Sequence, residues 1–228
     1  MFVHLRLHTE FSVVDGTCRI DDVLKAAQAD GQPALAITDL NNLFGGLKFY
    51  KSARSKGVKP VLGAELVMQP QGDEGESRLL VLVQNHQGYL NLSEILARAW
   101  TQPLGKTQTQ AQVAWAWLQE LHAGLIVLSG AHTGLVGQAL LRGDAATASR
   151  HALALAEMFP HRFYLELQRA GRAEDEALVA QTVELAARLQ LPVVATQPIQ
   201  FLRPDDFQAH EARVCIAEGE VLANAKRP

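Results

Sequence analysis

The sequence has little of what marks a secreted or a membrane protein. Its only cysteines, Cys18 and Cys215, are far apart and outside any CxxC spacing, which argues against a disulfide framework or a thiolate metal site. We interpret both as ordinary thiols. The longest apolar runs, such as Leu79–Val83 and Leu125–Leu128, are too short to cross a bilayer, and no charged-then-apolar leader precedes Phe2. We therefore expect a soluble cytoplasmic protein with no membrane partner.

The sequence also lacks an excess of charge of either sign. With 21 Lys and Arg against 24 Asp and Glu the net charge is -3, so tight DNA binding by this segment alone is not expected. Basic groups gather along one predicted helix and the turn after it, and we interpret them as a solvated helix face. These groups are Lys48, Lys51, Arg54, Lys56 and Lys59.

No polar low-complexity tract is present, and a hydrophobic content of 48% is enough for a real core, so the chain should be globular. Short runs rich in Val, Ile and Leu recur along it and are interpreted as seven parallel strands. They are Phe2–His8, Ala34–Thr38, Pro60–Val67, Leu79–Gln84, Gly124–Ser129, Arg162–Gln168 and Pro192–Thr196.

Amphipathic stretches between these runs predict helices, several of them closed by Gly or Pro. They are Ile20–Ala29, Leu47–Ser55, Gly88–Trp100, Gln112–Leu121, Leu135–Leu141, Ala145–Met158 and Glu174–Leu189. Two polar segments stand outside the pattern, an expected exposed loop at Gln69–Ser77 and a connector at Gln102–Gln110. Neither resembles a domain boundary, so we expect residues 1–228 to form one domain.

Repeated strand–helix units either open into a doubly wound sheet or close into a barrel. Seven units in one domain favour the barrel, and no GxGxxG or phosphate-loop pattern supports a nucleotide-binding open sheet. Polar residues fall at or just after the predicted strand ends, which meet at one mouth in a barrel. These residues are His8, Asp39, Glu65, Ser129, Glu166 and Thr196.

Four of the polar groups, His8, Asp15, Asp39 and Glu65, form a set of hard ligands. Imidazoles and carboxylates suit Zn, Mn, Mg or Fe, and two or three such ions can activate water for phosphoester hydrolysis. By itself this signal is weak, because any barrel collects acidic residues at its mouth.

Eight sequence blocks along nearly the whole chain carry a resemblance to a known family. The blocks are Phe2–Gly16, Ala34–Gly45, Val58–Glu65, Gln87–Leu92, Gly124–Gly130, Phe163–Gln168, Leu191–Thr196 and Asp205–Glu211. They resemble the N-terminal polymerase-and-histidinol-phosphatase (PHP) domain of alpha subunits of bacterial DNA polymerase III. The resemblance implies a distorted seven-stranded βα barrel of the TIM-like kind. It also implies an N-terminal piece of a several-fold longer DNA-directed DNA polymerase, a nucleotidyltransferase that uses Mg.

The resemblance also shows which metal ligands are missing. Metal-competent members carry His-x-His in the first strand, where this chain has Arg6 and His8, and Asp-His in the second block, where it has Asp39 and Leu40. The retained ligand positions are His8, Asp15, Asp39 and Glu65. The replaced ones include Arg6, Arg78, Ala131 and the last-strand stretch Gln197, Pro198, Ile199, Gln200.

The replacements have a direction, because Arg6 and Arg78 put fixed positive charge where cation ligands stood. A guanidinium beside a carboxylate offsets its charge through paired hydrogen bonds. We hypothesise that arginine stands in for metal here. No cofactor is expected in this domain, although the four retained groups leave room for one weakly bound Mg, Mn or Zn ion.

Two functions remain open for the domain. The first is a structural and interaction module that supports the polymerase and, as the resemblance implies, docks the separate proofreading exonuclease (epsilon) subunit; DNA would be contacted through the rest of the parent protein. The second is a residual metal-dependent phosphoesterase, a 3'-5' exonuclease or a pyrophosphatase, acting through the retained ligands. The degenerate ligand set favours the first.

The remaining histidines are interpreted without catalytic roles. His210, on the last predicted helix, is expected to cap or pack. Four others are expected at the surface, namely His86, His122, His151 and His161.

Overall fold

The computed structural model describes residues 2–72, 74–104 and 110–222. The chain divides into two compact units: a terminal unit of residues 1–62 with 198–228, and a central unit of residues 63–197. Parts of the two predicted polar segments, residue 73 and residues 105–109, lie outside the described residues. The expectation of one domain over 1–228 stays a prediction.

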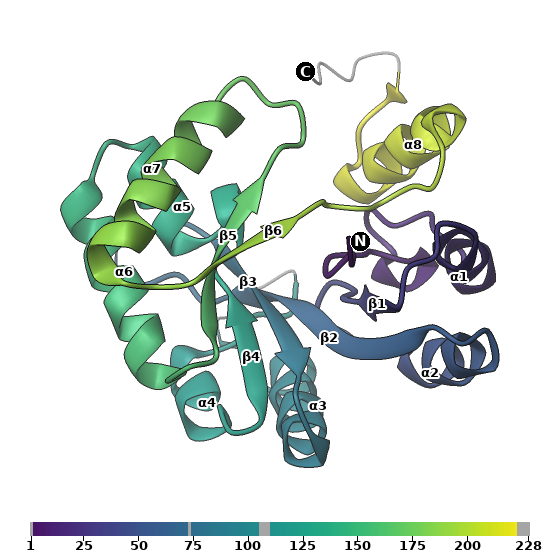
Figure 1. Ribbon diagram of the computed structural model, residues 1–228, viewed down its shortest axis with the longest axis horizontal. Helices are drawn as coiled ribbons and strands as arrows, with labels where there is room; N and C mark the ends of the chain where they lie inside the picture. Colours follow the sequence, from purple (N-terminus) through teal and green to yellow (C-terminus); the bar gives the residue numbers. More distant parts are fainter. Residues whose placement is uncertain (1, 73, 105–109, 223–228) are drawn as a thin grey trace. The chain divides into compact units, whose positions relative to one another are not determined.

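The terminal unit is built around two helices that follow the predicted bounds closely. Its elements are the 3-10 turn η1 (Glu10–Ser12), α1 (Ile20–Ala29), β1 (Ala34–Ile37), α2 (Gly46–Ser55), the first residues of β2 (Lys59–Met68), η3 (Pro204–Asp206) and α8 (Phe207–Glu218). Figure 1 shows these elements at the two ends of the colour scale.

The core of the terminal unit follows from helical periodicity. In α1 the buried side chains are Ile20, Val23, Leu24 and Ala27, the spacing of one apolar helix face. Acidic residues in the first turn of α1 complement the positive end of the helix dipole. The apolar face packs in one cluster with β1 and with the buried Phe49 of α2.

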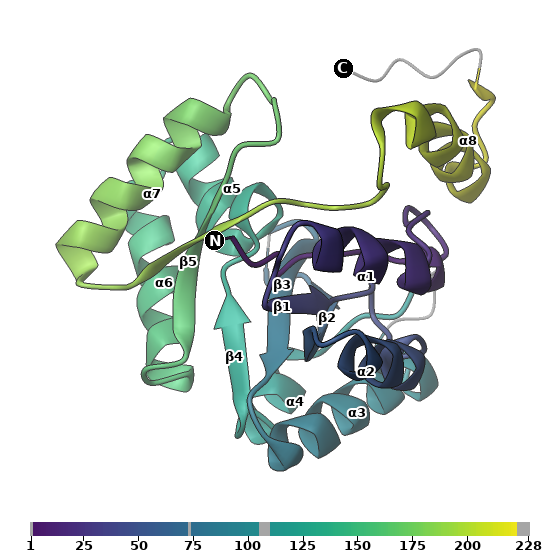
Figure 2. The same cartoon turned by 45° about the vertical axis from the view of Figure 1, so that its right-hand side comes forward.

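The central unit holds the rest of the sheet and most of the helices. Its elements are the remainder of β2, then β3 (Ser77–Val83), α3 (His86–Thr101), α4 (Trp115–Glu120), β4 (Leu125–Leu128), η2 (Ala131–Thr133), α5 (Leu135–Leu141), α6 (Ala145–Met158), β5 (Phe163–Gln168), α7 (Asp175–Leu189) and β6 (Val193–Thr196). The helices α5, α6 and α7 pack against one another, with α6 and α7 beside β5 (Figures 1 and 2).

Strand direction corrects one sequence prediction. The sheet has six strands in the order β1-β2-β3-β4-β5-β6, so the α/β class is confirmed. The pairs β1–β2, β4–β5 and β5–β6 are parallel, but β3 is antiparallel to both of its neighbours. For β2 and β3 the reason is their connection: residues 69–76 join them, and the described part of this loop holds no helix that could carry the chain back for a parallel pairing.

The predicted first strand, Phe2–His8, is not among the strands of the described chain. Its backbone does pair at single positions, where Ala36 N–H donates to His4 O and His8 N–H donates to Ile199 O. The ladder is interrupted because the N–H of Leu7 donates to the Thr38 hydroxyl, a side chain, at 2.9 Å. The prediction of seven strands was therefore wrong, because this segment is not one of the strands. Closure of the sheet into a barrel stays a prediction.

The described residues include both cysteines and the helices that were compared with the length and hydropathy of a membrane span. Both cysteines are free and buried, and burial, with help from Asp206 and Asp39, raises the pKa of the Cys18 thiol to about 12. Within the described ranges, no helix is both long and apolar enough to span a membrane.

Candidate functional site

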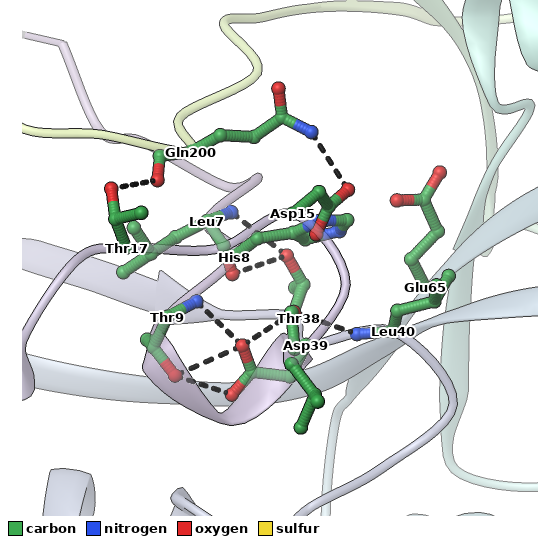
Figure 3. Close-up of polar contacts among 12 residues, drawn as sticks. Leu7, His8, Thr9, Asp15, Thr17, Thr38, Asp39, Leu40, Glu65 and Gln200 are labelled. Carbon is green, nitrogen blue, oxygen red and sulfur yellow. Dashed lines mark hydrogen bonds and ion pairs between the residues drawn. The ribbon is translucent and has the colours of Figure 1, made fainter. Parts of the chain in front are cut away.

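The most constrained acid of the terminal unit is Asp39, which follows the carboxyl end of β1. Its side chain is 1% exposed. The Oδ1 atom accepts hydrogen bonds from Thr9 N–H at 2.6 Å and from the Ser12 hydroxyl at 2.8 Å, and the Thr9 hydroxyl lies 2.8 Å from Oδ2 and 3.0 Å from Oδ1. Figure 3 shows Thr9 facing both carboxylate oxygens. Protein donors therefore hold both oxygens that a metal ion would use.

The turn that carries these donors is fixed by the same contacts. Thr9 caps η1, its hydroxyl accepting from Phe11 N–H. The Ser12 hydroxyl accepts in turn from the N–H of Leu40, the residue after Asp39. Short hydroxyl side chains commonly bond to nearby backbone in this way. The contacts tie the turn after His8 to the end of β1.

Burial sets the electrostatics of Asp39. Desolvation is the largest influence and raises the pKa of the Asp39 carboxyl, while the hydrogen bonds from Thr9 and Ser12 and the neighbouring His8 act in the opposite direction. A buried carboxylate is tolerated only when its oxygens are hydrogen-bonded or paired. The hydrogen bonds from Thr9 and Ser12 thus offset part of the cost of burying this acid.

His8 and Asp15 form a second group in the terminal unit. The His8 ring is buried, and its Nδ1 lies 2.9 and 3.0 Å from the two carboxylate oxygens of Asp15. A carboxylate behind an imidazole fixes the ring orientation, as it does for many metal-ligating histidines. In this arrangement Asp15 orients the His8 ring, and its role as a metal ligand stays a prediction.

The position of a lost family histidine is filled by Gln200, whose side chain completes this group. Its amide donates to Asp15 Oδ2 at 2.8 Å, while its backbone oxygen accepts from Thr17. His210 Nδ1 lies 2.8 Å from the backbone oxygen of Asp15, and its ring packs near Phe201. The packing role predicted for His210 is confirmed.

In the central unit, Glu65 lies beside Arg78. The two residues stand on the paired strands β2 and β3, and Arg78 Nη1 is 3.9 Å from Glu65 Oε2. Glu65 is 2% exposed and the Arg78 side chain 28%. One of the two predicted metal-replacing charges therefore adjoins a predicted ligand. The other, Arg6, is a buried residue of the terminal unit.

Three of the polar strand-end residues also meet in the central unit. Glu166 accepts hydrogen bonds from Gly130 N–H at 3.0 Å and from the Thr196 hydroxyl, and its own N–H donates to Ser129 Oγ at 2.9 Å. Gln168 adds a further amide donor to Glu166. The family's cysteine ligand position, Ala131, is a buried apolar residue. These three strand-end residues form one hydrogen-bond network, while the meeting of all six at one barrel mouth stays a prediction.

The donor set decides how well a metal centre fits. Across residues 2–72, 74–104 and 110–222, no group of three or more His, Cys, Asp or Glu is placed to hold a metal ion. A two- or three-ion centre needs bridging carboxylates with free lone pairs, and the oxygens of Asp39 already accept protein hydrogen bonds. The residues present do not fit a multi-metal cluster.

Sequence reasoning identified the acids but missed their hydrogen-bond partners. Thr9 and Ser12 were passed over as ordinary polar residues, and Gln200 was recognised as a replaced ligand position but not as a donor to Asp15. The available signal was that Thr9 and Ser12 stand next to His8 in the same block. Among the other histidines, His86 and His161 are exposed as predicted. His151 was wrongly expected at the surface: its side chain is 12% exposed because Glu74 covers it at 2.6 Å.

Replacing Thr9 by Val tests the network around Asp39. Val keeps the shape but removes the hydroxyl, so the buried Oδ2 atom of Asp39 loses its hydroxyl donor. We expect the free energy of unfolding in urea to fall by about 1–3 kcal/mol. Thr101→Val is the matched control, since Thr101 is exposed on α3, and it should change stability by less than about 0.5 kcal/mol. Equal effects of the two substitutions would contradict this assignment.

Comparison with known proteins extends over the whole chain. It is 49% identical to DNA polymerase III subunit alpha of Neisseria meningitidis over 232 residues and 43% identical to those of Pseudomonas aeruginosa and Escherichia coli. Each alignment covers all of this chain. The chain spans only about a fifth of the length of these relatives (19–20%).

Solved structures of low identity share the fold. An amidohydrolase from Chromobacterium violaceum, with bound sulfate and no metal, has a TM-score of 0.59 at 13% identity and covers 92% of this chain and 96% of its own. A candidate metal-dependent phosphoesterase from Bifidobacterium adolescentis has a TM-score of 0.53 with the same coverage. The PHP domain model matches residues 4–170. The chain therefore belongs to the PHP domain family, in the form found in DNA polymerase III alpha subunits.

Proposed function

We propose that this chain is a metal-poor PHP module that supports a replicative polymerase and docks its proofreading exonuclease subunit. One observation carries the first part: the Asp39 carboxylate, central to the family's ligand set, has both oxygens occupied by hydrogen bonds from Thr9 and Ser12. Hydrogen bonds from the protein thus stabilise this buried acid, as a buried polar group requires. The site holds its shape through hydrogen bonds.

The other replaced positions support the same proposal. Arg78 brings positive charge to Glu65, and Gln200 gives an amide donor to Asp15. The fixed guanidinium of Arg78 offsets negative charge and has no lone pair for a metal ion, and the amide N–H of Gln200 gives Asp15 a hydrogen bond. Arginine acting in place of metal at Arg6 and Arg78 belongs to this proposal.

The polymerase activity is proposed for the parent protein alone. Similarity to DNA polymerase III subunit alpha supports a cytoplasmic DNA-directed DNA polymerase that adds nucleotides by Mg-dependent phosphoryl transfer. The carboxylates for that reaction would lie outside these 228 residues. The chain by itself should neither extend primers nor bind DNA tightly, and DNA would be a partner of the parent protein.

A second function has one observation in its favour. The carboxylate of Asp15 holds His8 in the manner typical of a metal-ligating histidine, and a solved structure of the same fold is described as a candidate metal-dependent phosphoesterase. A single Mg, Mn or Zn ion bound through His8 would support slow hydrolysis of DNA 3' ends or of pyrophosphate. The donors already on Asp39 favour the first function.

Metal content separates the two functions. The purified chain should contain far less than one metal ion per molecule by elemental analysis, and it should release no phosphate from DNA 3' ends or pyrophosphate with Mn or Zn added. Stoichiometric metal, with activity that Asp39→Asn abolishes, would overturn the proposal. Asp144→Asn is the matched control, because Asp144 caps α6 far along the chain and Asn caps helices equally well.

Docking of the exonuclease has its own test. Titrating the C-terminal segment of the same bacterium's proofreading exonuclease onto the chain should give saturable binding at one segment per chain by calorimetry. A segment of the same composition in scrambled order is the control and should not bind. Absence of binding by the native segment would refute the docking part of the proposal and leave the metal-poor site untouched.

A further inference from the structure

A cleft in the terminal unit lies away from the acids described above. Its volume is about 460 Å³, which is within the range of small-molecule sites. Residues from the end of α2, the turn after it and the starts of β1 and β2 line it. They are Pro33, Tyr50, Arg54, Gly57, Val58, Lys59 and Pro60.

The strand register places this cleft at the opposite end of β1 from Asp39. Strands β1 and β2 run parallel with Ala34 opposite Lys59, and Lys59 N–H donates to Pro33 O at 2.9 Å. Asp39 follows the other end of β1, about five residues or roughly 16 Å along an extended chain. The cleft is therefore separate from the candidate site; Figure 2 shows α2 beside the early part of β2.

The positive charge at the cleft is not offset. Two of the basic groups on and after α2 have carboxylate partners. Lys48 Nζ lies 3.7 Å from Glu10 Oε1, and Lys56 Nζ lies 3.9 Å from Asp21 Oδ1. In the part of the chain that the structure describes, no ion pair within 4.0 Å joins Arg54 or Lys59 to a carboxylate. Both of these side chains are exposed. The basic helix face that the sequence predicted to be merely solvated thus presents Arg54 and Lys59, neither paired with a carboxylate among the described residues, to this cleft.

An aromatic ring stands beside these cations. Tyr50 is 40% exposed, and the Arg54 guanidinium carbon lies 5.6 Å from its ring centroid. Arg54 Nη1 also donates to the Tyr50 hydroxyl at 3.2 Å, as the spacing of four residues on a helix allows. The contact orders a flat guanidinium next to a flat ring. Such pairs serve as stacking surfaces for nucleic-acid bases.

The C-terminal end of α2 repels an anion in the cleft only weakly. The carbonyls of a helix C-terminus carry partial negative charge. Here Ala53 O accepts from Val58 N–H at 3.0 Å, and Arg54 O accepts from Gly57 N–H at 3.2 Å. These carbonyls are turned to backbone donors, so the two full positive charges dominate. Gly57, at a φ of +73°, leaves the space above it open, since a Cβ there would meet no atom within 4 Å.

We propose that this cleft binds a nucleotide unit, with its phosphate on Arg54 and Lys59 and its base stacked on the Arg54–Tyr50 pair. Phosphate and a planar base are the two groups that this combination of cations and an aromatic ring recognises. The unit comes either from a free nucleotide or from a single strand of DNA. Its affinity is modest and falls with salt, because two cations on a chain of net charge -3 do the binding.

Fluorescence anisotropy of the 228-residue chain with a fluorescein-labelled oligothymidine at low salt tests this proposal. We expect Arg54→Glu and Lys59→Glu each to weaken binding by about tenfold. Arg142→Glu is the matched control, an exposed arginine in the central unit, and should change binding less than about twofold. Tyr50→Leu should weaken binding of the oligonucleotide and leave competition by inorganic phosphate unchanged, with circular dichroism confirming that every variant folds.

Competition identifies the source of the nucleotide. Thymidine monophosphate that competes at the concentration at which the oligonucleotide binds indicates a free nucleotide. Competition only at far higher concentration indicates a single strand. Binding that is unchanged in both charge reversals would overturn the proposal, as would an equal loss in Arg142→Glu. An oligoglutamate peptide that competes better than the monophosphate would do the same, because it would make the cleft a site for acidic peptides.

Discussion

The buried carboxylate of Asp39 and the donors around it are the constraint on which the site depends. An acid that is 1% exposed must be given hydrogen bonds or neutralised. Thr9 and Ser12 supply them from the turn after the first segment of the chain. The chain can therefore lose metal ligands and still keep the buried acid Asp39, because Thr9 and Ser12 hydrogen-bond to it.

Much of the fold follows from local patterns. The bounds of α1, α5 and α6 agree with the predicted ranges because apolar periodicity marks each helix and a glycine or proline follows its C-terminal end. Strand direction was harder to predict, because it depends on what joins two strands. The short loop between β2 and β3 carried that information, but the expectation of repeated parallel units overrode it. In the Phe2–His8 segment the Leu7 N–H donates to the Thr38 hydroxyl, a partner that the apolar pattern of the sequence does not reveal.

The site was predictable in its acids and not in their partners. Asp39 and His8 were found through their position after strands and through the resemblance to PHP domains. Thr9, Ser12 and Gln200 have no chemical signature of their own, and their roles appear only when the turn places them against a carboxylate. Gln200 shows the limit most clearly: the sequence revealed a lost histidine, and the structure revealed a new donor to Asp15.

An anomalous-scattering measurement tests the central claim most directly. Crystals of the chain soaked in Mn²⁺ should show no ion within about 2.6 Å of the Asp39 oxygens, the reach of a carboxylate–cation bond, and Thr9 and Ser12 should remain in hydrogen-bond contact with them. A fully occupied Mn²⁺ bound by Asp39 and His8, with the Thr9 contact broken, would contradict the account. It would show that hydrogen bonds yield to metal at this site.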